Sequence, residues 1–220
     1  MEEKMKSTMN LKEIEKRAFR STYQDGLWDI YYGLIVISMA LFIYRPEKGY
    51  GWWNMVLMSV SFLVFYFLFF LGKKYITVPR LGLVKFGELR RKRNRTMGIV
   101  LSVFIALQIL MVIATATGWF YKQFGSWMAL HLKGSHELLL VSIISSLMVC
   151  VGMSVIAHFS DFIRGYYITI MMSLAVFIMI YLNKPLIPVI LGLVIVIPGV
   201  VMLARFISQY PPRTVEDNHD

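Results

Sequence analysis

Hydrophobic residues along this chain gather in long runs that are separated by short polar segments. A helix needs about 20 apolar residues to cross a hydrocarbon core of roughly 30 Å, and six runs reach or approach that length. They are Trp28–Tyr44, Trp52–Leu71, Met97–Phe120, Leu138–His158, Tyr166–Leu182 and Leu186–Phe206. The pattern predicts an all-α, polytopic transmembrane helix bundle of six spans over residues 28–206.

The two ends of the chain are more polar than this central region. In residues 1–27, Leu11, Ile14, Ala18 and Phe19 recur at helical spacing among basic residues. This spacing predicts an amphipathic helix on the cytoplasmic surface, packed on either the membrane or the basic loop described below. Residues 207–220 are predicted to form a cytoplasmic C-terminal tail.

The composition supports a membrane protein and excludes an ordinary soluble domain. Hydrophobic residues make up 57% of the chain and charged residues 16%, whereas soluble domains average about 25% charged residues. The net charge of +10 would raise the question of nucleic acid in a soluble protein. In a membrane protein the positions of the charges matter more than their sum, and we expect no nucleic-acid partner. Cys150 is the sole cysteine, so no intramolecular disulfide can form.

The distribution of basic residues predicts how the chain is oriented. If the chain crosses the membrane six times, 18 of the 23 Lys and Arg residues fall on one side and five on the other. Cytoplasmic loops are enriched in Lys and Arg. Both termini are therefore predicted to be cytoplasmic, in a multi-pass protein of the cell membrane.

The segment 73–96, between the second and third runs, is the most basic part of the chain. It carries nine basic residues against one acidic residue, Glu88. The basic residues are Lys73, Lys74, Arg80, Lys85, Arg90, Arg91, Lys92, Arg93 and Arg95. Each Lys or Arg at the headgroups of an anionic leaflet contributes about 1 kcal/mol to binding. The segment could bind anionic lipid headgroups or a cytoplasmic partner, or it could be a signal for topology alone.

The same segment also contains a pattern typical of a β-hairpin. Tyr75–Val78 and Leu83–Phe86 are short runs with strand character. Pro79 and Gly82 bound a four-residue connection that suits a turn. We therefore expect a small hairpin here, followed by a helical extension of the third span that begins near Glu88.

Four polar residues in or beside the apolar runs are candidates for a polar pathway: Asp25, Asp29, Gln108 and His158. Two carboxylates four residues apart could bind a cation or share a proton. The alternative is structural, with Asp25 capping the first helix and Asp29 pairing with an arginine of the basic segment. Unpaired carboxylates in a cavity would favour transport or catalysis, whereas salt-bridged carboxylates would favour the structural alternative.

Three segments together resemble a family of small polytopic prokaryotic membrane proteins. They are Tyr23–Asp29, Pro79–Gly87 and Arg205–Pro211. The resemblance covers about a fifth of the chain and implies a multi-pass membrane protein without implying an activity.

The function that the sequence favours is that of a non-enzymatic membrane component whose basic face engages anionic lipid or a cytoplasmic partner. The alternatives are a small oligomeric transporter or channel and a lipid-modifying membrane enzyme. The spacing of His131, His136 and Glu137 matches no strong metal-ligand pattern. We therefore expect no cofactor, no metal site and no catalytic residues, and a homo-oligomer is compatible with the pattern.

Overall fold

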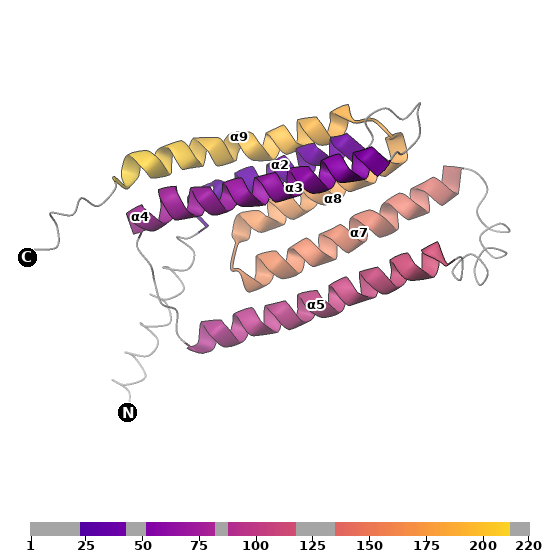
Figure 1. The fold of residues 1–220 in the computed structure, drawn as a ribbon, viewed down its shortest axis with the longest axis horizontal. Coiled ribbons are helices and arrows are strands. Elements are labelled where there is room, and N and C mark those ends of the chain that lie inside the picture. The colour runs from indigo at the N-terminus through magenta and orange to yellow at the C-terminus, as the bar shows by residue number, and fades with distance from the viewer. Residues whose placement is uncertain (1–22, 43–51, 82–87, 118–134, 212–220) are drawn as a thin grey trace, which may run out of the picture. The chain divides into compact units, whose positions relative to one another are not determined.

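The computed structural model describes residues 23–42, 52–81, 88–117 and 135–211. Within these ranges the chain is all-α (Figure 1). The long helices are α2 (Leu27–Phe42), α3 (Trp52–Gly72), α5 (Glu88–Ala116), α7 (Ser135–Phe159), α8 (Ile163–Leu182) and α9 (Leu186–Gln209). Helices satisfy their backbone hydrogen bonds internally, which is what an apolar segment needs in lipid.

Five of these helical segments are long and apolar enough to cross a membrane, so the chain is a multi-pass membrane protein. The five candidate spans are Val56–Arg80, Arg91–Leu110, Leu138–Phe159, Ile163–Leu182 and Leu186–Gln209. The first predicted span, Trp28–Tyr44, corresponds to α2, whose 16 residues extend about 24 Å, and residues 43 and 44 of this span lie outside the described residues. The predicted orientation stays a prediction, and the predicted N-terminal helix lies outside the described residues.

The described helices form two compact units, and each is treated by itself. Unit 1 contains α2, α3 and α9, and unit 2 contains α5, α7 and α8.

In unit 1, α2 packs against α9 and α3. The buried residues of α9, which are Pro188, Gly192, Ile195, Gly199 and Phe206, lie three, four or seven positions apart and so form one stripe. The backbones approach closely where the chain enters α2. Gly26 has a φ of +76°, and a Cβ at this position would overlap the carbonyl oxygen of Gly199. An added Cβ at Gly199 would lie 2.9 Å from Asp29 Cβ, so the close approach depends on glycine at both positions.

In unit 2, α7 packs against α8 and also contacts α5. The turn from α7 to α8 is a Schellman-type cap. The N–H of Asp161 donates to the carbonyl of His158, and the N–H of Phe162 donates to the carbonyl of Ala157. Asp161 takes the left-handed conformation of the cap, with a φ of 52°. Glycine is the usual residue at this position, and the contact of the Asp161 side chain that accompanies this exception is described below.

The predicted β-hairpin is wrong over its first strand. Residues 73–81 instead continue α3 as a π-helical turn, η2 (Lys73–Thr77), and a short helix, α4 (Val78–Leu81). The N–H of Val78 donates to the carbonyl of Lys73, which closes the wide turn. Pro79 falls in the first turn of α4, where its missing N–H is tolerated. The second predicted strand, Leu83–Phe86, lies outside the described residues.

The helical extension predicted for the third span is confirmed, because α5 begins at Glu88.

Candidate functional site

The basic residues of the segment 73–96 are divided between two structural settings. Lys73, Lys74 and Arg80 lie on η2 and α4 in unit 1, whereas Arg91, Lys92, Arg93 and Arg95 lie in the first turns of α5 in unit 2. Lys85 lies outside the described residues. Arg90 is part of α5, but its side chain is not described.

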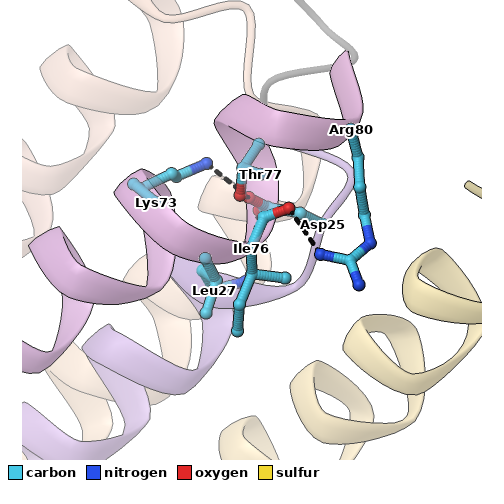
Figure 2. A network of polar contacts seen from close by, with 6 residues as sticks. All are labelled: Asp25, Leu27, Lys73, Ile76, Thr77 and Arg80. Atoms are coloured by element: carbon cyan, nitrogen blue, oxygen red, sulfur yellow. Dashed lines mark hydrogen bonds and ion pairs between the residues drawn. The ribbon is translucent and has the colours of Figure 1, made fainter. Parts of the chain in front are cut away.

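The site in unit 1 centres on Asp25, the residue two positions before α2 begins. Its side chain is fully buried and accepts hydrogen bonds from three donors (Figure 2). One carboxylate oxygen accepts from the N–H of Leu27 at 3.2 Å. The other accepts from Lys73 Nζ at 2.7 Å and from Thr77 Oγ1 at 2.5 Å. Asp25 therefore both caps the start of α2 and joins it to η2.

Two of these donors come from the same helical segment. Lys73 and Thr77 are four residues apart, at the first and last positions of η2, and residues at this spacing are neighbours on a helix surface. Both side chains are directed at Asp25, as Figure 2 shows. A break between α3 and α4 at this point would separate the two donors from the carboxylate.

Aromatic side chains surround the Lys73 ammonium. Lys73 Nζ lies 5.9 Å from the centroid of the Trp28 ring and 5.8 Å from that of Phe69, within the range of a cation–π interaction. The Trp28 ring is itself held by a stack on Tyr23 at 5.3 Å and a second stack on Tyr32 at 5.7 Å. The ammonium group therefore has a carboxylate and two aromatic rings as neighbours.

The other charged residues near this site have separate contacts. Arg80 donates from Nη1 to the carbonyl of Ile76 at 2.9 Å (Figure 2), and the Lys74 ammonium lies 5.5 Å from the Tyr75 ring centroid. Asp29 is buried in the first turn of α2. Its Cβ faces Gly199 of α9, where an added Cβ would lie 2.9 Å away.

The site in unit 2 lies where α5 begins. Arg93 forms a forked ion pair with Asp161, at 2.6 Å from Nη1 and 3.1 Å from Nη2. Nη2 of Arg93 also donates to the carbonyl of His158 at 2.6 Å. This use of the Asp161 side chain accounts for an aspartate in the left-handed cap position. The neighbouring side chains of Arg91, Lys92 and Arg95 are exposed.

The four residues of the predicted polar pathway lie in both units. Asp25 and Asp29 lie at the start of α2 in unit 1. Gln108 is half-buried in α5, and His158 is exposed at the end of α7, both in unit 2. The predicted capping role of Asp25 is confirmed by its bond to Leu27, and Asp25 is also ion-paired with Lys73. The pathway itself, and the pairing of Asp29 with an arginine, stay predictions.

Two partners in these sites were not predicted from the sequence. Thr77 had been assigned to a strand, although its spacing of four from Lys73 was a signal for a shared helical face. Asp161 shows in the sequence only as a polar residue between two apolar runs, and its contact with Arg93 spans 68 positions.

The part of the chain that the structure describes contains no group of three His, Cys, Asp or Glu side chains that could hold a metal ion.

Comparisons with protein-family models, with curated proteins and with solved structures found no match.

Proposed function

We propose that this protein is a non-enzymatic membrane component whose exposed basic residues at the start of α5 bind anionic lipid headgroups. The observation that carries this proposal is that the basic residues at the start of α5 differ in exposure and pairing. Arg93 is held by Asp161 and by the His158 carbonyl, whereas Arg91, Lys92 and Arg95 are exposed. These three exposed cations are the proposed headgroup contacts.

The length of α5 supports a position at the headgroups. The helix has 29 residues and extends about 43 Å, more than the roughly 30 Å of a hydrocarbon core. Beyond Arg95, α5 contains no charged residue. An Arg or Lys at the centre of the membrane costs about 2.5–3.5 kcal/mol, so the basic turns are expected to lie outside the hydrocarbon.

The helical spacing of the cations also favours an anionic ligand. Arg91 and Arg95 are four residues apart, so their side chains are neighbours on the helix surface. Like charges at this spacing destabilise a helix, and a phosphate group between them would remove that repulsion. Arginine also matches phosphate geometry through two parallel hydrogen bonds.

The pairing of Asp25 favours this proposal over transport or lipid chemistry. A carboxylate that works as a catalytic base has to be free to take a proton from substrate, whereas the Asp25 carboxylate is paired with Lys73 and also accepts from Leu27 and Thr77. A salt-bridged carboxylate is the arrangement expected of a structural role.

The test is lipid binding by the purified full chain in detergent, followed by native mass spectrometry. The triple variant R91Q/K92Q/R95Q should bind phosphatidylglycerol about tenfold to 100-fold more weakly than the wild type, because each lost cation removes up to about 1 kcal/mol. Binding of phosphatidylcholine should be unchanged. Raising the salt concentration should reduce the difference.

The matched control is K74Q/K184Q/R205Q, which removes three exposed cations elsewhere on the chain. It should weaken phosphatidylglycerol binding much less than the α5 variant. Equal losses in the two triple variants would mean that only net charge matters. Unchanged binding in R91Q/K92Q/R95Q would refute the proposal.

A further inference from the structure

We propose that Asp25, Thr77, Trp28 and Phe69 form an ammonium-binding site that Lys73 occupies, and that a small organic ammonium ion binds there in competition with Lys73. These four residues are called the ammonium cage below. All of them belong to unit 1. The inference goes beyond lipid binding and uses none of the α5 cations.

The carboxylate of the cage is fixed before any cation arrives. Asp25 is fully buried, and two of its three donors come from the helices on either side of it. The Leu27 N–H belongs to α2, and the Thr77 hydroxyl belongs to η2. These two bonds hold the carboxylate in place and leave acceptor capacity for one cationic group. Lys73 supplies that group at 2.7 Å.

The aromatic members of the cage select an ammonium group over a hard metal cation. Trp28 and Phe69 lie within 6 Å of Lys73 Nζ, at the distance where a ring face attracts an organic cation. Metal cations such as Ca²⁺ and Mg²⁺ take six or more oxygen ligands, whereas the cage offers the oxygens of one carboxylate and one hydroxyl. The ligand class that fits is a primary or methylated amine in its charged form.

The exposure and flexibility of Lys73 favour displacement of its ammonium group from Asp25. Its side chain is 21% exposed, whereas that of Asp25 is fully buried, so the cage can be reached along the lysine stem. A lysine ammonium is a compact charge on a flexible four-carbon stem. The Arg93–Asp161 pair of unit 2 is different, because its forked geometry fixes the arginine through two parallel bonds. Of these two ion pairs within the described residues, Asp25–Lys73 is therefore the one whose cation we infer to be exchangeable.

The test uses methylammonium, which reproduces the end of the lysine side chain, and the full chain in detergent. In K73A the truncated side chain leaves the cage open. Methylammonium should then raise the thermal unfolding temperature and quench tryptophan fluorescence in a saturable manner. Sodium chloride at the same ionic strength should do neither. The matched control D25N/K73A should bind methylammonium at least about tenfold more weakly, because it lacks the carboxylate.

Methylammonium binding by the wild-type protein distinguishes an exchangeable Lys73 from a fixed ion pair. Because the tethered Lys73 competes at an effective concentration in the millimolar range, the wild type should bind methylammonium about tenfold or more weakly than K73A, but still saturably. Absence of saturable binding in the wild type, or equal binding by K73A and D25N/K73A, would overturn the inference. If K73A does not fold, the comparison is wild type against D25N, and equal responses of these two proteins would overturn it as well.

Discussion

Two ion pairs within the described residues, Asp25–Lys73 and Arg93–Asp161, differ in how deeply they are buried. Asp25 and Lys73 in unit 1 have side chains that are 0% and 21% exposed, whereas those of Asp161 and Arg93 in unit 2 are 14% and 33% exposed. The first pair has exchanged water for a hydroxyl, a backbone N–H and two aromatic rings. The second remains within reach of solvent. A charge removed from the first pair should therefore have much larger consequences than one removed from the second.

The backbones also approach more closely at Gly199 in unit 1 than at Gly98 in unit 2. In unit 1 the backbone of α9 at Gly199 lies close to α2, where an added Cβ would be 3.0 Å from the backbone nitrogen of Ile30. In unit 2 the backbone of α5 at Gly98 has nothing within 4 Å of an added Cβ. The comparison teaches that the buried charged pair lies in the unit where α2 and α9 approach closely, whereas Arg91, Lys92 and Arg95 are exposed on α5, whose Gly98 has open space around it.

The largest effect is expected from breaking the buried pair. Lys73→Met removes the ammonium and leaves the Asp25 carboxylate buried without its counter-charge. We expect the free energy of unfolding to fall by about 3–5 kcal/mol, measured by denaturation in mixed micelles.

The double variant D25N/K73M tests the reason for that loss. It removes both charges. The oxygen of the new amide can still accept from the Leu27 N–H, and its NH2 group can donate to Thr77 Oγ1, so most of the lost stability should return. If the double variant is no more stable than K73M, the cost does not come from an uncompensated carboxylate, and the contrast between the two ion pairs would lose its basis.

A smaller effect is expected from filling the close contact between α2 and α9. Gly199→Ala places a methyl group 2.9 Å from Asp29 Cβ and 3.0 Å from the Ile30 nitrogen. Overpacking of this kind costs about 1–3 kcal/mol. Gly98→Ala is the matched control within a helix, and it should stabilise the protein by up to about 1 kcal/mol, because alanine favours helix and space is open. Thermal unfolding of the two variants should therefore shift in opposite directions.

The smallest effect is expected at the exposed pair. Arg93→Gln should lower the free energy of unfolding by about 1 kcal/mol or less, because solvent screens the pair. A double-mutant cycle with Asp161→Asn measures the interaction directly. A coupling energy as large as that of the Asp25–Lys73 pair would show that exposure does not separate the two sites.

Apolar run length predicted most of the fold, because a helix of membrane length is specified by local composition. Five of the six predicted spans match helices of sufficient length, and the first predicted span, Trp28–Tyr44, corresponds to α2, which is described over 16 residues. The strand predicted at Tyr75–Val78 was wrong because the β-propensity of four residues is a weak signal that tertiary context overrides. The contacts of Lys73 and Thr77 with Asp25, about 50 positions away, instead accompany a helix that continues through this segment.

The candidate sites were predicted in part. The basic residues were recognised from charge alone, but the pattern could not separate Arg93 from Arg91 and Arg95. That difference depends on a partner 68 residues away. Capping of α2 by Asp25 was one of two alternatives that the sequence allowed, and the bond from the Leu27 N–H to Asp25 agrees with it, because capping is a local interaction.

The sequence by itself determined that this chain is a multi-pass helical membrane protein, because the hydrophobic effect acts on composition and length within each segment. The tertiary structure alone decided which charges are buried and which are exposed. Burial of a charge depends on donors and aromatic rings supplied by other helices, and no local pattern at Asp25 or Arg93 contains that information.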